Sequence, residues 1–234
     1  MLLSVDKLNT HYGRAHILHD VGLNVAPGEV VVLLGRNGAG KSTTMKSIMG
    51  LVSPTSGTVV FNGESIGGEE AYQIARRGIG YVPEDRRIFT SLTVAENLRI
   101  GRQSRDQSKP AWDEDRLLSL FPNLADMLKR SGNEMSGGEQ QMLTVARAMM
   151  GNPSLLLMDE PSEGLAPVFV ERLAMLIAEL KRSKVSILLT EQDTRLAADV
   201  ADRAYVIEKG TVCFSGTISE IEADDEIKSQ FLAI

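Results

Sequence analysis

Apolar residues recur along this chain in two patterns, and each pattern predicts a different kind of strand. Residues 2–8 alternate between apolar and polar, which is typical of a half-buried strand. Val30 to Leu34 and Leu155 to Met158 are short continuous apolar runs, which is typical of strands covered on both faces. Further strands are predicted at residues 17–25, 58–61, 185–190, 204–208 and 211–215.

Helical patterns fill most of the gaps between these strands. We expect helices from Lys41 to about Leu51 and over residues 167–182, where Pro167 suits a first turn. Residues of about 93–150 are predicted to form a mostly helical lobe with a polar interruption at 103–110, and further helices are expected at 194–201 and 219–234. Strands that alternate with helices predict an α/β fold with a mostly parallel core sheet. Early strands without helices between them predict an antiparallel β edge, all within one domain spanning residues 1–234.

Composition narrows the class of protein. Hydrophobic residues make up 43% of the chain and charged residues 24%, which is the balance of an ordinary globular protein. The formal net charge of −6 argues against nucleic acid as the main ligand, because phosphate backbones favour basic surfaces. No stretch approaches the roughly 18 apolar residues that a membrane-crossing helix needs. Any role at a membrane is therefore expected to come through a partner.

A glycine-rich segment after the first apolar run carries the strongest chemical signal. Residues 35–42 match the phosphate-loop pattern, in which backbone N–H groups and the N-terminus of a following helix surround phosphates. Lys41 is expected to reach the β- and γ-phosphates, Ser42 to coordinate Mg²⁺, and Thr43 to help hold the α- and β-phosphates. The other residues expected to contact the nucleotide are Gly35, Asn37, Gly38, Ala39 and Gly40. A glycine turn before a helix is the plainer interpretation, but the strand before and the helix after favour a nucleotide.

Two carboxylates follow the second apolar run. Asp159 and Glu160 stand where a strand ends, and ligands of open α/β sheets bind at such ends. Asp159 is suited to hold Mg²⁺ through its water shell, and Glu160 is suited to act as general base on the attacking water. The alternative is a solvated acidic turn without a catalytic role, but the phosphate loop upstream favours the interpretation as a catalytic pair.

The segment Ser136-Gly137-Gly138-Glu139 can be interpreted in two ways. Ser136 and Glu139 form the S-x-x-E capping box that begins many helices. Capping does not explain Gly137 and Gly138, which would leave the helix N-terminus open to a phosphate.

With this segment the chain resembles the ATPases of ABC transporters over essentially its whole length. The resemblance implies that ATP is sandwiched in a dimer, with Ser136, Gly137 and Gly138 touching the γ-phosphate held by Lys41 of the other subunit. It also places Tyr12 against the adenine ring, although a tyrosine in a surface turn is the alternative. Together these expectations define a P-loop NTPase of the ABC ATPase type, with Mg²⁺ and ATP as its cofactors.

Three positions depart from the commonest pattern of that family. Glu84 stands where a magnesium-sensing glutamine is usual, Gln192 where a switch histidine is usual, and Ala166 where an aspartate is usual. Glu84 can still offer an oxygen to Mg²⁺, so the expected metal set is Ser42, Glu84 and Asp159. Gln192 can donate a hydrogen bond but cannot carry a proton, so the expected catalytic set is Glu160, Gln192 and Lys41. A catalytically weak regulatory subunit is the alternative.

The set of short motifs is most similar to one of the two ATPase subunits of branched-chain amino acid importers. It combines residues 82–84, 86–89, 136–143, 164–167 and 191–192. The resemblance implies a paralogous second ATPase or a homodimer, two membrane permeases docked near Arg86, Arg87 and Phe89, and indirectly a substrate-binding protein. It implies a peripheral location at the cytoplasmic face of the plasma (inner) membrane. The ATPase of a urea or short-chain amide importer is the alternative. A soluble ABC protein that acts on ribosomes or DNA usually carries two ATPase units in one chain or a long coiled-coil insertion, and this sequence shows neither.

Overall fold

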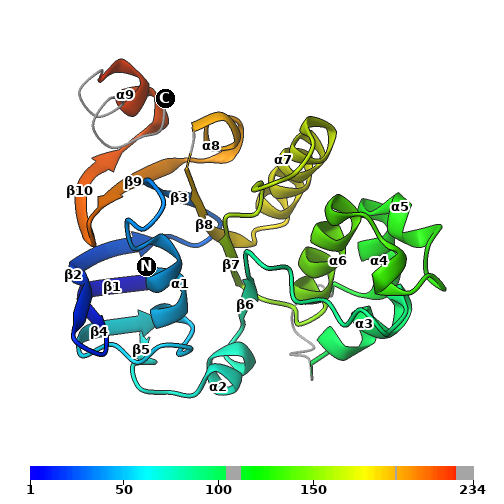
Figure 1. Cartoon of the computed structure of the whole chain (residues 1–234), viewed down its shortest axis with the longest axis horizontal. Coiled ribbons are helices and arrows are strands. Elements are labelled where there is room, and N and C mark those ends of the chain that lie inside the picture. Colours follow the sequence, from blue (N-terminus) through cyan, green and yellow to red (C-terminus); the bar gives the residue numbers. More distant parts are fainter. Residues whose placement is uncertain (104–111, 193, 225–234) are drawn as a thin grey trace.

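The chain folds around two β-sheets and a group of helices set to one side (Figure 1). The computed structural model describes residues 1–103, 112–192 and 194–224. The first sheet is antiparallel, with strand order β2-β1-β4-β5. Its strands are β1 (Leu3–Tyr12), β2 (Ala15–Val25), β4 (Ser56–Phe61) and β5 (Glu64–Ser65).

The second sheet carries the residues expected to do chemistry. Its order is β10-β9-β3-β8-β7-β6, and every neighbouring pair is parallel except β9 with β10. Its strands are β3 (Val30–Leu34), β6 (Ile79–Val82), β7 (Leu155–Asp159), β8 (Ser186–Glu191), β9 (Arg203–Glu208) and β10 (Thr211–Gly216). Because β3, β7 and β8 run in the same direction, the segments that follow them meet at one edge of the sheet.

Helices surround the second sheet and form a separate group on its β6 side (Figure 1). Those packed near the sheets are α1 (Lys41–Ile48), α2 (Ala71–Arg76), α7 (Pro167–Arg182), α8 (Thr194–Val200) and α9 (Ile218–Ala223). Those of the separate group are α3 (Val94–Gly101), α4 (Glu114–Leu120), α5 (Pro122–Ala125), the 3₁₀ turn η1 (Gly132–Glu134) and α6 (Gly137–Met149). Within residues 1–103, 112–192 and 194–224, no helix combines the length and apolar composition needed to cross a bilayer.

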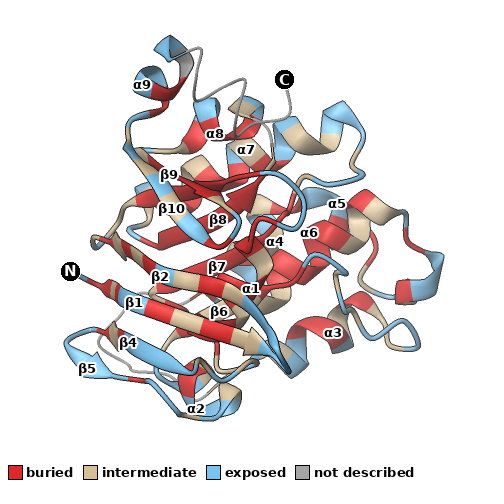
Figure 2. Ribbon diagram, turned by 60° about the vertical axis from the view of Figure 1, so that its left-hand side comes forward, coloured by how far each residue is buried: buried red, intermediate tan, exposed pale blue. Residues whose placement is uncertain are grey.

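Burial explains the continuous apolar run of β3. Val30, Val32 and Leu34 belong to the core that packs against the helices, whereas Val31 and Leu33 belong to the core shared with the antiparallel sheet. All five side chains are fully buried, and the central strands appear as a buried layer in Figure 2. A strand buried on both faces has no polar positions, which is the pattern seen in the sequence.

The predicted α/β fold, with a mostly parallel core sheet, is confirmed. The antiparallel strands form a sheet of their own that packs against the core sheet, and α2 and β6 were not predicted. The helix expected over 219–234 begins at Ile218 and ends at Ala223, with Asp224 as its C-cap. Residues 225–234 lie outside the described residues, as does most of the predicted interruption at 103–110.

Candidate nucleotide site

The glycine-rich loop joins the end of β3 to the start of α1. Gly40 is the N-cap of α1 with φ 113°, and Gly38 has φ 79°, a region that residues with a side chain rarely adopt. A Cβ on Gly35 would lie 2.4 Å from the carbonyl oxygen of Ile207, so the loop passes too close to β9 for any other residue. Ala39 is buried at the base of the loop, where its carbonyl accepts a hydrogen bond from the Gly210 N–H at 2.8 Å. The loop is thus held in place before any ligand binds.

The Lys41 side chain points into the loop and not toward solvent. Its side chain is 3% exposed, and Nζ donates hydrogen bonds to the carbonyls of Gly35 at 2.6 Å and Arg36 at 3.1 Å. Nζ also lies 3.0 Å from Oε1 of Glu160, so the charge is paired across the gap between α1 and β7. A buried cation with a carboxylate partner is positioned to receive phosphate oxygens.

Asp159 is the centre of a cluster of hydroxyl groups. Oδ1 accepts hydrogen bonds from Ser42 Oγ at 2.9 Å and from Thr190 Oγ1 at 2.9 Å, and Oδ2 accepts one from the Tyr81 hydroxyl at 3.1 Å. The carboxylate is 1% exposed, so it is fixed by these donors. Burial beside Asp159 raises the pKa of Tyr81, which keeps the phenol protonated and donating. Ser42 and Asp159, expected to share a metal ion, are therefore in contact.

Glu160 directly follows Asp159 and turns toward the loop. Its φ of 44° lies in the left-handed region, and its N–H donates to Thr190 Oγ1 at 2.9 Å. Gln192 Nε2 donates to Oε2 of Glu160 at 2.7 Å, while Lys41 holds Oε1. Burial alone would raise the pKa of Glu160, but hydrogen bonds from Gln192, Lys41 and Glu163 together hold the pKa below its ordinary value. The carboxylate is therefore kept in the basic form that a general base requires.

A cavity of about 440 Å³ opens where these groups meet. Its wall contains loop residues, three glutamates and an aromatic ring, whereas Asp159 lines a neighbouring cavity together with Glu84. The predicted site residues that line it are Tyr12, Asn37, Gly38, Gly40, Lys41, Ser42, Thr43, Glu84 and Glu160. Tyr12 ends β1 and is half exposed, and Glu84 follows β6. Gln192 reaches this group through Glu160.

The signature residues lie elsewhere in the same chain. Ser136 is the N-cap of α6, and the capping box with Glu139 is formed as expected from the sequence. A Cβ on Gly138 would lie 2.4 Å from the Phe169 ring, and one on Gly137 would lie 2.8 Å from Arg86 Nη1. Among the described residues, Ser136, Gly137 and Gly138 contribute nothing to the wall of the phosphate-loop cavity. One chain therefore does not bring the two halves of the predicted ATP site together.

Three residues near the site were not identified from the sequence. Thr190 and Tyr81 position Asp159, and Glu163 lines the cavity three residues after Glu160. The pKa of Glu163 is raised, first by its hydrogen bond with Glu160 and then by burial. Spacing alone could have identified Glu163, because a third carboxylate so close to two others falls in the same turn. Thr190 and Tyr81 require knowledge of which strands are neighbours.

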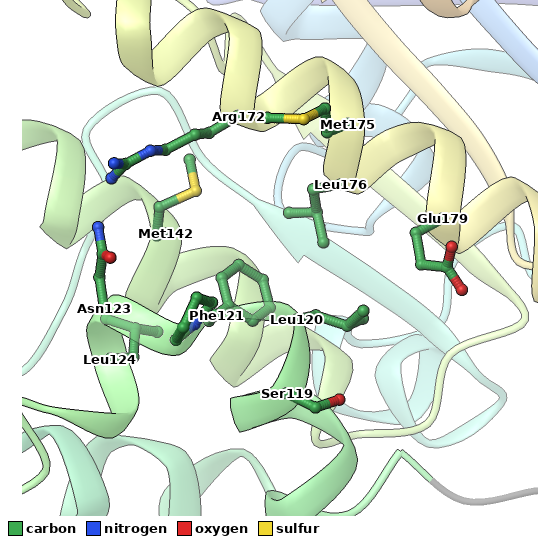
Figure 3. A pocket seen from close by; sticks show the side chains of 11 residues that line it. Ser119, Leu120, Phe121, Asn123, Leu124, Met142, Arg172, Met175, Leu176 and Glu179 are labelled. Carbon is green, nitrogen blue, oxygen red and sulfur yellow. The ribbon is translucent and has the colours of Figure 1, made fainter.

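A second cavity, of about 390 Å³, lies between α7 and the segment from α4 to α5 (Figure 3). Leu120, Phe121, Met142 and Leu176 give it largely apolar walls, and Arg172 lies at one end. None of the predicted site residues that the structure describes is part of its lining. Its apolar character makes it a poor match for a triphosphate, so the candidate nucleotide site is the cavity at the phosphate loop.

A glycine-rich loop between a buried parallel strand and a helix, beside two carboxylates that end a neighbouring parallel strand, defines a P-loop nucleotide-hydrolysing protein. The ABC transporter family matches residues 18–163, and the chain belongs to this family as one of its ATPases. ATP or ADP is accordingly the class of ligand that it binds.

Relatives of matching length have names connected with transport. The chain is 41% identical over 231 residues to the high-affinity branched-chain amino acid transport ATP-binding protein BraG of Pseudomonas aeruginosa, with 99% of each chain covered. It is 36% identical over 234 residues to the probable branched-chain amino acid transport ATP-binding protein LivF of Archaeoglobus fulgidus, covering 100% of this chain and 99% of LivF. The lipopolysaccharide export system ATP-binding protein LptB of Escherichia coli is 34% identical over 232 residues, with 98% and 96% covered.

Solved structures agree with the fold. An ATP-binding cassette of an ABC transporter in its ADP conformation superposes with a TM-score of 0.83 at 26% identity, covering 97% of both chains. A dimeric ATP-binding cassette in a post-hydrolysis state, bound to ADP and phosphate, superposes with a TM-score of 0.79 at 23% identity, covering 92% of this chain and 98% of the other.

Proposed function

We propose that this chain hydrolyses Mg-ATP to power the uptake of branched-chain amino acids through a membrane ABC transporter, as one of its two ATPase subunits. The observation that carries the proposal is the 41% identity to BraG over 99% of both chains, against 34% for LptB of Escherichia coli. The motif set at residues 82–84, 86–89, 136–143, 164–167 and 191–192 points to the same subfamily.

The oxygen atoms around Asp159 suit Mg²⁺. Ser42 Oγ and Asp159 Oδ1 are 2.9 Å apart, and Glu84 lines the same cavity, which gives the hard oxygen donors that Mg²⁺ prefers. Among the described residues no group of three His, Cys, Asp or Glu side chains is arranged to hold a metal alone, so phosphate oxygens and water are needed to complete the set. When bound, the ion neutralises charge on the phosphates.

Hydrolysis then follows from the positions of three side chains. Glu160, with its lowered pKa, accepts a proton from the attacking water. Lys41 is freed from Glu160 to bind phosphate oxygens, and the glycine-loop N–H groups hold the remaining oxygens. Gln192 keeps the carboxylate of Glu160 oriented through its 2.7 Å hydrogen bond. The half-exposed Tyr12 ring, which lines the cavity, is available to stack on adenine.

A second subunit is required to complete this site. The N-terminus of α6 with Ser136, Gly137 and Gly138 is a phosphate-binding feature that its own chain leaves outside the cavity. We therefore place these residues on the γ-phosphate of a neighbouring copy or paralogue, as in the dimeric arrangement typical of the family.

A surface near the loop after β6 is suited to bind the permeases. A cavity of about 280 Å³ there is flanked by Phe89 and Ile100, which are 47% and 52% exposed. Arg147 lies beneath Phe89, and its buried Nη1 has no hydrogen-bond partner within the described part of the chain. A segment with an apolar side chain and an oxygen acceptor would satisfy both features. Binding of two permeases at this surface would place the chain at the cytoplasmic face of the inner membrane, and would link it indirectly to a substrate-binding protein.

The proposal is tested by deleting the gene in its host and measuring uptake of radiolabelled leucine and urea. We expect leucine uptake to fall and to return with the wild-type gene, but not with Glu160→Gln, which retains ATP binding. If urea uptake is lost and leucine uptake is unchanged, the short-chain amide alternative replaces the proposal. If neither changes but lipopolysaccharide export fails, the similarity to LptB is the better guide.

A further inference from the structure

Arg86 lies against the first turn of the signature helix. It follows β6 in a loop that runs toward α6 (Figure 1). If Gly137 carried a Cβ, that atom would be 2.8 Å from Arg86 Nη1, 3.3 Å from Cζ and 3.4 Å from Nη2. The guanidinium is therefore stacked on the first residue of α6, and the absence of a side chain at Gly137 makes room for it.

The backbone around Arg86 is held in a costly conformation. Arg86 and Arg87 have φ values of 62° and 46°, so two consecutive residues with side chains are left-handed. The Arg86 carbonyl accepts a hydrogen bond from Thr144 Oγ1 at 2.8 Å, and the Arg87 carbonyl accepts one from Arg147 Nη2 at 2.7 Å. Both donors come from α6, so the loop is fastened to the same helix on which the Arg86 side chain lies. Strain of this kind persists where the surroundings enforce it, which is often at functional sites.

The Arg86 guanidinium differs from that of its neighbour Arg87 in its partners. Arg87 pairs with Asp85 at 2.8 Å, whereas within the described residues the half-buried guanidinium of Arg86 has no ion pair or hydrogen bond. The carboxylate of Glu139 at this helix start is engaged by the Ser136 N–H at 2.7 Å. A free guanidinium thus sits beside the positive end of a 13-residue helix, and two positive groups so placed favour binding of an anion.

We propose that Arg86 is a nucleotide-binding residue acting across the dimer: its guanidinium contacts the terminal phosphates of the ATP that the partner subunit holds on its own phosphate loop. The inference rests on the proposed dimer. It adds a charged side chain to Ser136, Gly137 and Gly138, which supply only a hydroxyl and backbone N–H groups.

ATP-driven dimerisation of the full-length chain tests this assignment. The parent is Glu160→Gln, in which bound ATP is not hydrolysed, and the dimer dissociation constant is measured by sedimentation with ATP and Mg²⁺. We expect Arg86→Gln to weaken the dimer by about 10- to 100-fold, the range for one charged hydrogen bond, and Arg86→Lys to recover part of the loss. Arg99→Gln, the same change at an exposed arginine of α3, should leave dimerisation near the parent value.

Mixed dimers of two differently tagged copies separate action across the dimer from action within one chain. If Lys41→Ala is on one copy and Arg86→Gln on the other, one site keeps both a normal Lys41 and a normal partner Arg86. If both changes are on one copy, no such site remains. We therefore expect more retained ATP per dimer in the first arrangement.

Three results would overturn the assignment: Arg86→Gln dimerising as well as its parent, Arg86→Lys losing as much as Arg86→Gln, or equal ATP retention in the two mixed dimers. Failure of the proposed function is distinguishable. In that case the Glu160→Gln parent itself would not dimerise with ATP, whatever residue stands at position 86.

Discussion

Lys41 and Gln192 contact different oxygens of the Glu160 carboxylate, so the roles of these two neighbours can be tested separately. Lys41 Nζ is 3.0 Å from Oε1, and Gln192 Nε2 is 2.7 Å from Oε2. Replacing Gln192 with alanine removes one of these donors and leaves the carboxylate in place. Replacing Glu160 with glutamine keeps the shape of the side chain and removes the base. The two substitutions therefore separate orientation of the base from its chemistry.

The expected losses differ in size. A positioned general base contributes about 10²- to 10⁴-fold to a rate, so Glu160→Gln should lower ATP turnover by at least about 100-fold. One hydrogen bond to a charged group is worth about 1.5–3 kcal/mol, and Gln192→Ala leaves the base itself in place, so this change should cost only about tenfold. Because the Gln192 hydrogen bond lowers the pKa of Glu160, its removal lets burial raise that pKa. The acid limb of the pH–rate profile should then move to higher pH in Gln192→Ala.

The assay is steady-state ATP hydrolysis by the transporter complex in vesicles, measured from about pH 3.5 to about pH 8, so that the range around and below the ordinary pKa of a carboxyl group is covered, with nucleotide binding measured separately. Both variants should bind ATP, which shows that a lost rate is a loss of chemistry. The reasoning fails if Gln192→Ala abolishes turnover as completely as Glu160→Gln. It also fails if the acid limb of Gln192→Ala stays where it is in the wild type.

Three further predictions concern stability, each followed by urea unfolding of the purified chain. Thr190→Val should destabilise the fold by about 2–4 kcal/mol, because it removes a hydrogen bond to Asp159 and leaves a buried N–H unpaired; an unchanged midpoint would contradict this. Gly210→Ala should lower the free energy of unfolding by at least about 2 kcal/mol more than Gly63→Ala. The two glycines have similar φ values of 79° and 82°, but only a Cβ at position 210 would meet a carbonyl oxygen, that of Ile17 at 1.9 Å. Equal losses of stability would refute the steric argument. Because the pKa of Glu160 is lower in the folded chain than its ordinary value of 4.5, the ionised carboxylate stabilises the fold at pH values above 4.5. This stabilisation is lost as the pH falls through the pKa of Glu160 in the folded chain. The wild type should therefore lose more stability than Glu160→Gln on acidification, and parallel losses would contradict this.

The parts of the site that sequence could predict are those carried by one continuous segment. The phosphate loop needs only an apolar strand, three glycines and a helix start, so residues 35–43 could be located by pattern. Asp159 and Glu160 could be located because they directly follow an apolar run. The capping box of Ser136 and Glu139 depends on a spacing of three residues within one turn, and it forms as expected from that spacing.

Contacts between segments depend on strand order, which the sequence does not state. Thr190 reaches Asp159 because β8 lies beside β7 with these two residues in register. Tyr81 reaches the same carboxylate because β6 is the neighbour on the other side. Strand β6 was missed because Gly80 interrupts its apolar run, and helix α2 was missed because six residues make fewer than two helical turns.

The loop from Pro83 to Arg87 connects the two halves of the proposed site. Glu84 at its start lines the cavity of its own phosphate loop, while Arg86 and Arg87 are hydrogen-bonded through their carbonyls to Thr144 and Arg147 of α6. Any rotation of α6 that preserves these two hydrogen bonds carries the backbone of Arg86 along with the signature glycines. If Arg86 contacts a partner's nucleotide as proposed, that contact is made by the same short loop that carries Glu84.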